Sequence, residues 1–118
     1  MIYTAILFAT IVRVIDGDTL VVNLPCDIDL ICSNVPLRVM HIDTPEIRGK
    51  CHKEKQLAQQ AKAITSSMFK EGSTIIIASA KRDKFYRILA DVPALSKRLI
   101  DEGFARRYEG GVKSSWCN

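Results

Sequence analysis

Residues 9–24 read ATIVRVIDGDTLVVNL, two runs rich in β-branched residues on either side of Asp16, Gly17 and Asp18. An Asp-Gly step between two such runs is typical of a tight turn or a bulge. The stretch therefore predicts a tight hairpin or a bent strand. It also places two carboxylates at the bend.

Three more strands are predicted along the chain, at residues 37–42, 73–80 and 86–92. The first ends at Thr44-Pro45, because proline removes a backbone donor and keeps the preceding residue extended. The other two flank a polar loop and are expected to pair with each other. Residues 25–36 mix Cys, Asp, Asn, Ser and Pro, and we expect them to form a connection.

Two helices complete the predicted order of elements. Residues 52–70 carry an apolar stripe at helical spacing, formed by Leu57, Ala61, Ile64 and Met68 and widened by Ala58 and Phe69. A second helix opens at Pro93, faces inward through Leu95, Leu99 and Ile100, and closes at Gly103. The tail from residue 106 is predicted to be irregular. Sequential strands that must cover their own edges commonly curl into a small barrel.

Composition places the chain among ordinary globular domains. Of its 118 residues, 47% are hydrophobic and 25% are charged, which excludes disorder and low-complexity assemblies. The apolar stretch at residues 2–12 is shorter than the roughly 20 residues that span a bilayer, and we expect a strand there, neither a membrane anchor nor a signal peptide.

The net charge of +4 is unevenly distributed. Residues 1–46 have a net charge of −4, and the rest of the chain has +8. This asymmetry suits a protein that binds both a cation and a polyanion. A solvated charged surface with no partner is the alternative, and charge alone favours it.

Four carboxylates stand near predicted strand bends: Asp16, Asp18, Asp43 and Glu46. Oxygen ligands from two chain segments could hold a hard cation such as Ca²⁺. Each aspartate could equally serve a turn through hydrogen bonds from its side chain to the backbone. The spacing is not that of an EF-hand loop.

A basic cluster with two aromatic residues, KRDKFYR, covers residues 81–87. Arginines bind phosphate oxygens and aromatic rings stack on bases, so the cluster fits nucleic acid, although a solvated loop is the commoner outcome. Arg38 differs because it stands within an apolar strand, where a charge needs a partner. Either a structural carboxylate or a phosphate could be that partner.

The histidines and cysteines of the sequence argue against two further kinds of site, a nucleophilic triad and a structural zinc site. His41 and His52 match no nucleophilic triad, and a structural role is expected for both. The four cysteines lack zinc-type spacing, which argues against a structural zinc site. They allow three disulfide pairings, and we favour Cys51 with Cys117, because that bridge would hold a tail with few apolar residues.

Three motifs, in order, resemble the staphylococcal nuclease family. They are residues 14–19 (VIDGDT); Arg38 followed by residues 42–46 (IDTPE); and residues 83–87 (DKFYR) followed by residues 99–105. The resemblance runs from about Ala9 to Trp116. It implies a mainly β structure with helices, a five-stranded OB-fold barrel in one domain over residues 1–118.

The resemblance also implies a calcium-dependent nuclease that acts on DNA and RNA and leaves 3′-phosphate and 5′-hydroxyl ends. Asp18, Asp43 and the Thr44 carbonyl would bind Ca²⁺, with Asp16 close by. Glu46 would orient or deprotonate the attacking water, and Arg38 and Arg87 would stabilise the transition state. Lys84 and Tyr108 would contact the substrate.

The chain departs from the family pattern at Phe85 and Tyr86, where the family usually has Tyr followed by Gly. Phe85 lacks a hydroxyl that would bind a terminal phosphate. The hairpin before the last helix is shortened, and the long C-terminal helix of the type member is absent.

The alternative from another class is a non-catalytic OB-type module that binds nucleic acid or protein. Such degenerate relatives lose the acidic and arginine residues that this chain keeps, so we favour the enzyme. A monomer without membrane association is expected. Secretion or a periplasmic location is favoured because relatives are often exported, and a cytoplasmic location stays open because the chain shows no signal peptide.

Overall fold

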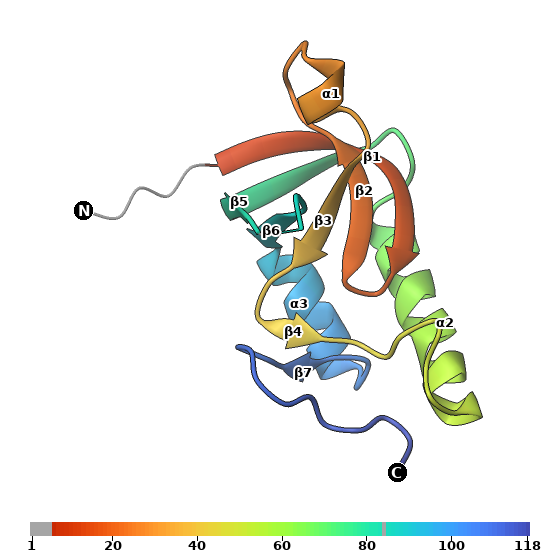
Figure 1. Cartoon of the computed structure of the whole chain (residues 1–118). Coiled ribbons are helices and arrows are strands. Elements are labelled where there is room, and N and C mark those ends of the chain that lie inside the picture. The colour runs from red at the N-terminus through yellow and green to blue at the C-terminus, as the bar shows by residue number, and fades with distance from the viewer. Residues whose placement is uncertain (1–5, 84) are drawn as a thin grey trace.

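Five strands close into a barrel in the computed structural model, which describes residues 6–83 and 85–118 (Figure 1). The barrel strands are β1 (Ile6–Asp16), β2 (Thr19–Asn23), β3 (Val35–Val39), β5 (Thr74–Arg82) and β6 (Ile88–Asp91). Their order is β1-β2-β3-β6-β5, and β5 pairs back to β1. The pairs are antiparallel except β3 with β6, which is parallel. The predicted five-stranded OB-type barrel is confirmed.

The predicted bend is a hairpin whose turn contains Gly17. β1 pairs with β2 from Thr10–Asn23 to Asp16–Thr19, with two register shifts that bend β1. A Cβ at Gly17 would lie 2.9 Å from the Cβ of Ala61 in α2 (His52–Met68), so glycine allows the turn to approach this helix closely. The hydroxyl of Thr65 donates a hydrogen bond of 2.7 Å to the Gly17 carbonyl and joins the same two elements.

The buried face of α2 differs in part from the predicted apolar stripe. Ala58 and Ala61 are buried as expected, but the other buried positions are polar, Glu54 and Thr65. Leu57, Ile64 and Met68 are only half-buried. Polar side chains are tolerated in the interior when their hydrogen bonds are made, and both Glu54 and Thr65 meet this condition.

The predicted strand at residues 37–42 is two strands in the structure. β3 ends at Val39, His41 adopts a positive φ of 72°, and β4 covers Ile42–Asp43. The tail, which we expected to be irregular, contains β7 (Arg106–Arg107), and β7 pairs with β4. The tail is thereby held across one end of the barrel, opposite the end that carries α1 (Asp29–Cys32) (Figure 1). This short helix lies in the predicted connection.

The strand predicted at residues 86–92 is β6, and it pairs with β5 as expected. It begins two residues later because Tyr86 adopts a positive φ of 63° in the preceding turn. Val92 then leads into α3 (Pro93–Asp101). Leu95 and Leu99 are buried as predicted, and Ile100 packs partly buried against the same core.

Two disulfides close loops of very different size. Cys26 pairs with Cys32 around α1, and Cys51 pairs with Cys117, which confirms the favoured pairing. Across the part of the chain that the structure describes, every helix is too short or too polar to cross a membrane.

Candidate active site

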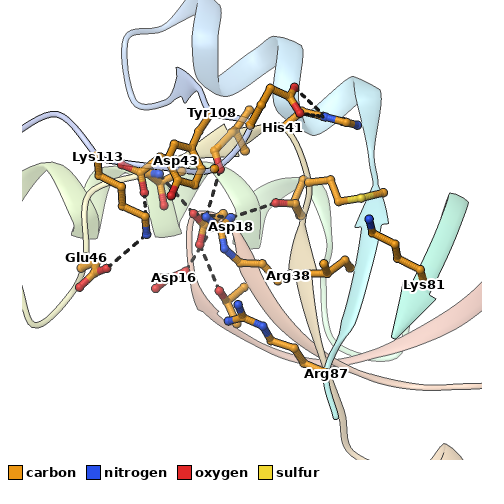
Figure 2. Close-up of a pocket in the computed structure, with 18 residues that line it drawn as sticks. Asp16, Asp18, Arg38, His41, Asp43, Glu46, Lys81, Arg87, Tyr108 and Lys113 are labelled. Atoms are coloured by element: carbon orange, nitrogen blue, oxygen red, sulfur yellow. Dashed lines mark hydrogen bonds and ion pairs between the residues drawn. The ribbon is translucent and has the colours of Figure 1, made fainter. Parts of the chain in front are cut away.

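One open pocket, beside the end of the barrel where the tail crosses, collects most of the residues that the sequence singled out (Figure 2). The predicted site residues that line it are Asp18, Arg38, Asp43, Thr44, Glu46, Arg87 and Tyr108, together with Asp16. They come from the β1–β2 turn, β3, β4 and the loop after it, the turn before β6, and the tail. Lys84 lies outside the described residues.

Arg38 and Asp18 form the central ion pair of the pocket. Arg38 Nη1 lies 2.7 Å from Asp18 Oδ2, and both side chains are largely buried. The guanidinium also donates to the carbonyls of Val39 at 2.9 Å and Ile42 at 3.1 Å. A carboxylate and two carbonyls thus supply the partner that the charge in this apolar strand required, and they fix the plane of the guanidinium.

The carboxylate of Asp18 also fastens β4 to the hairpin. Its Oδ2 accepts a hydrogen bond of 3.2 Å from the Thr44 backbone N–H. The Thr44 hydroxyl beside it is buried and has no hydrogen-bond partner among the described residues. An orphaned buried hydroxyl next to buried carboxylates is the environment expected where an additional polar ligand belongs.

The pKa of Asp16 is raised by its surroundings at the turn. Burial, and then repulsion from Asp18, raise the pKa of Asp16 to about 7, against an opposing hydrogen bond from the Asp18 backbone N–H. Like charges held this close favour either a shared proton or a cation.

Arg87 reaches the same pocket from the turn before β6. Its Nε donates to Asp83 Oδ2, and Asp83 Oδ1 accepts from the backbone N–H groups of Phe85 and Arg87. Burial on its own would raise the pKa of Asp83, but the hydrogen bonds from Arg87 and the backbone outweigh it, and this pKa lies below its ordinary value. Asp83 therefore holds Arg87 as a charged partner while leaving the two Nη groups of Arg87 to the pocket.

Glu46 lies in a loop that is organised by a second, buried glutamate. Glu54 Oε2 accepts from the Glu46 backbone N–H at 3.1 Å, and Glu54 Oε1 accepts from the Lys50 backbone N–H at 3.0 Å. Gly49 passes directly over this carboxylate, since a Cβ there would lie 2.5 Å from Glu54 Cγ. The side chain of Glu46 itself is exposed and points toward Lys113 (Figure 2).

The tail contributes a cation and a hydrogen-bond donor to Asp43. Lys113 Nζ lies 3.3 Å from Asp43 Oδ1 and 3.9 Å from Glu46 Oε1. The indole N–H of Trp116 donates to Asp43 Oδ2 at 3.2 Å. Tyr108 donates from its hydroxyl to the Gly111 carbonyl at 2.7 Å, which shapes the tail beside the pocket.

His41 takes the structural role expected for it. Its Nδ1 lies 2.8 Å from Glu109 Oε1, so it ties the turn after β3 to the tail. His52 is exposed at the start of α2, so the structural role expected for it stays a prediction.

Sequence reasoning missed Glu54, Lys113 and Trp116. Only the spacing of Glu54 could have indicated its burial, because it lies one helical step before Ala58 on the face that Ala58 and Ala61 share. Trp116 is the only tryptophan of the chain, a composition signal without a location. No local sequence pattern distinguishes Lys113 from the other lysines of the chain.

The oxygen atoms of the pocket suit a hard cation, although its side chains do not form a complete metal site. Among residues 6–83 and 85–118, no three His, Cys, Asp or Glu side chains are grouped closely enough to hold a metal ion by themselves. The buried Asp18 and Asp43, the Thr44 main chain and its orphaned hydroxyl are nevertheless all oxygen donors, and Ca²⁺ sites commonly draw on carbonyls and water as well. The residues therefore fit such an ion.

A closed five-stranded barrel with a pocket that pairs arginines with carboxylates defines an OB-type barrel protein whose pocket is lined by charged side chains. The sequence profile described as staphylococcal nuclease homologue matches residues 36–115. The chain belongs to this family, whose members are generally nuclease hydrolases. The match includes the segments of β3, β4 and β6 that line the pocket, but not the hairpin that carries Asp16 and Asp18. A comparison with curated protein sequences gives no significant match.

Proposed function

We propose that this protein is a calcium-dependent phosphodiesterase that hydrolyses DNA and RNA and leaves 3′-phosphate and 5′-hydroxyl ends. One observation carries the proposal: two arginines held by carboxylates, Arg38 and Arg87, line one pocket with the exposed carboxylate of Glu46. In the hydrolysis of a phosphodiester, fixed cations stabilise the negative charge of the transition state and a base activates the attacking water.

Arg38 acts as a preorganised donor in this proposal. Its contacts to Asp18, Val39 and Ile42 occupy part of its guanidinium and leave N–H groups for a phosphate oxygen. Because the group is already oriented, it does not have to reorganise as negative charge grows on the phosphoryl oxygens.

Arg87 complements Arg38 from the turn before β6. Asp83 engages its Nε, so the two Nη groups can donate to the phosphate, in the bidentate geometry that arginine favours. Two cations from separate parts of the chain would then stabilise the negative charge that develops on the oxygens around the five-coordinate phosphorus.

Glu46 accepts the proton of the attacking water. Its side chain is exposed and carries no direct hydrogen bond from the described residues, while Glu54 holds its backbone in place. The water oxygen bonds to phosphorus and the bond from phosphorus to the 5′ oxygen breaks. The departing oxygen takes a proton from solvent water to become the 5′-hydroxyl, and Glu46 returns its proton to solvent.

Asp18, Asp43 and the Thr44 carbonyl would hold Ca²⁺, with Asp16 close by. When bound, the ion polarises a phosphoryl oxygen and offsets negative charge. Tyr108 at the pocket and the basic second half of the chain would bind the nucleic acid, and Lys84 is proposed as a further phosphate contact from the resemblance alone.

Two disulfides suit an oxidising compartment, and we propose secretion or a periplasmic location on this ground. We also propose that residues 1–118 act as one nuclease domain and as a monomer, which light scattering on the purified protein would check.

Cleavage assays on single-stranded and duplex DNA and on RNA test the proposed activity. Turnover should require Ca²⁺, stop with EDTA, and be lost in Asp43→Ala, because a site that loses a charged oxygen ligand holds calcium more weakly. Nucleic-acid binding should persist without the metal and weaken as salt rises. Folded protein that retains nucleic acid but never cuts it would support the binding module instead.

A further inference from the structure

The carboxylate of Asp43 is held by two donors of different character, both from the tail. Lys113 is a half-exposed cation that approaches Oδ1 at 3.3 Å. Trp116 is 7% exposed, and its indole N–H donates to Oδ2 at 3.2 Å. The indole is the rigid partner, since a buried aromatic ring has less freedom than a long exposed ammonium.

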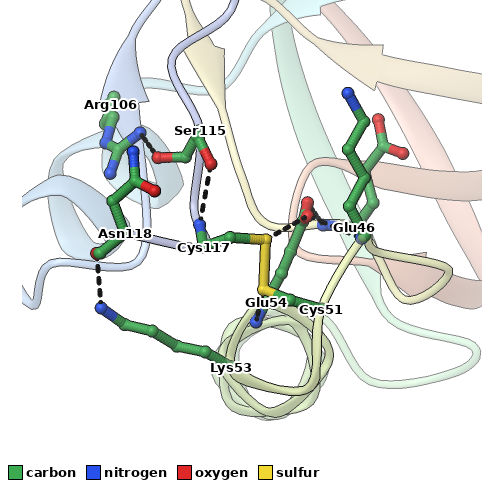
Figure 3. Close-up of a disulfide and its surroundings, with 9 residues drawn as sticks. Glu46, Cys51, Lys53, Glu54, Arg106, Ser115, Cys117 and Asn118 are labelled. Carbon is green, nitrogen blue, oxygen red and sulfur yellow. Dashed lines mark hydrogen bonds between the residues drawn. A yellow bond between two sulfur atoms is a disulfide. The ribbon is translucent and has the colours of Figure 1, made fainter.

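Trp116 is itself held on both sides along the chain. The Arg106 guanidinium lies 3.8 Å from the centre of the indole ring and donates from Nη1 to the Ser115 carbonyl at 2.9 Å. The following residue, Cys117, is bonded to Cys51 at the start of α2 (Figure 3). A cation–π contact holds the Trp116 ring itself, and a hydrogen bond to Ser115 and a disulfide at Cys117 hold the residues on either side of it.

The backbone of β7 also pairs with the backbone of β4 at Asp43. Arg106 in β7 pairs with Asp43 in β4, so the residue that stacks on Trp116 is also the ladder partner of Asp43. This closes a ring of contacts from Asp43 through Arg106 and Trp116 back to the Asp43 carboxylate.

We propose that Trp116 is a positioning residue for Asp43, an inference that rests on the proposed calcium-dependent function. The indole engages Oδ2 and thereby sets the rotation of the carboxylate, so Oδ1 is presented to a cation, the place where Lys113 lies in this structure. Hydrogen bonds to metal-ligating carboxylates orient them, and losing one typically weakens metal affinity about 10- to 100-fold.

Trp116→Phe tests the proposal, because it removes the N–H and keeps a ring for Arg106. Isothermal titration calorimetry should show Ca²⁺ affinity about 10- to 100-fold weaker, while turnover at saturating Ca²⁺ is largely retained. Ser115→Ala is the matched control, since it removes the Ser115 hydroxyl that accepts from the Cys117 N–H but leaves the indole in place, and it should bind Ca²⁺ like the parent.

Unchanged affinity in folded Trp116→Phe would overturn the inference and leave the proposed nuclease standing. Parent protein that binds no Ca²⁺ would overturn both. If the variant does not fold, the parent still decides: its single indole N–H resonance should shift in NMR spectra during a Ca²⁺ titration, with the midpoint found by calorimetry. A resonance that does not move while Ca²⁺ binds would overturn the positioning role.

Discussion

The buried carboxylate of Glu54 accepts a hydrogen bond of 3.1 Å from the backbone N–H of Glu46, eight residues earlier. Its other oxygen accepts from Lys50, so one side chain of α2 holds both ends of the loop that carries the proposed base. Glu46 thus depends on a helix residue that never enters the pocket.

Glu54→Gln should disturb this loop, because the amide offers a donor where an acceptor is needed. We expect a loss of about 1–3 kcal/mol in the free energy of unfolding, the usual cost of a buried polar group left unsatisfied. Turnover should fall with it, since Glu46 loses its anchor. Urea unfolding and cleavage rates measure the two effects. The exposed Glu71→Gln is the control, and an equally stable Glu54→Gln with full activity would contradict the prediction.

Arg87→Ala should lower kcat about 100-fold or more, the typical effect of removing one preorganised donor to the transition state. Its stability should change little, because Arg87 is partly exposed. The exposed Arg98→Ala on α3 is the matched control and should cleave like the parent. Near-normal turnover of folded Arg87→Ala would remove Arg87 from the mechanism.

Arg38→Ala should lower both turnover and stability. It leaves the largely buried carboxylate of Asp18 without its cation, and breaking such a pair costs about 3 kcal/mol or more. Urea unfolding of Arg38→Ala and Arg87→Ala, measured side by side, separates the loss of stability from the loss of turnover, because only Arg38→Ala is expected to unfold more easily. Equal stability of the two variants would mean that the ion pair of Arg38 with Asp18 contributes nothing net.

The two disulfides should differ in their contribution to stability. The Cys51–Cys117 bridge closes a 66-residue separation and the Cys26–Cys32 bridge closes 6 residues. From loop-closure entropy, replacing both cysteines of a bridge by serine should cost about 4 kcal/mol for the first and about 2 kcal/mol for the second. Denaturant unfolding of the two double variants makes the comparison. A larger loss from the short loop would show that the chain-entropy argument fails here.

Phe85→Tyr should tighten the binding of a nucleoside bisphosphate. Phe85 lies beside Arg87, 5.7 Å from ring centre to guanidinium carbon, so a hydroxyl added there could reach a phosphate bound by that arginine. A hydrogen bond to a charged group contributes about 1.5–3 kcal/mol, which corresponds to about tenfold or more in affinity. Equal affinities of the two proteins would show that the hydroxyl has no role in this pocket.

Local patterns predicted the parts of this molecule that local forces determine. The hairpin around Gly17 and the inward face of α3 follow from residue spacing, and both are in the structure. The need of Arg38 for a partner could also be predicted, but the choice of Asp18 depends on the pairing of β2 with β3.

Distant hydrogen bonds account for what the sequence did not reveal. Helical periodicity places Glu54 on the same face as Ala58 and Ala61, but it does not reveal the backbone donors of a separate loop that satisfy its buried carboxylate. Trp116 reaches Asp43 because β7 and a disulfide hold the tail, although the tail has few apolar residues. Motif order pointed to the candidate residues. Asp18 and Asp83, which hold Arg38 and Arg87, lie within the motifs. Glu54 and Trp116, which hold the Glu46 backbone and the Asp43 carboxylate, lie outside them.

The parallel pairing of β3 with β6 has a consequence for the timing of assembly. β3 is made early and β6 much later, so Arg38 and Arg87 share a pocket only once most of the chain exists, and Trp116 joins later still. Non-local pairings of this kind form late and slowly. A growing chain therefore lacks the complete site until the segments that carry Arg87 and Trp116 have been made and have packed against the earlier strands.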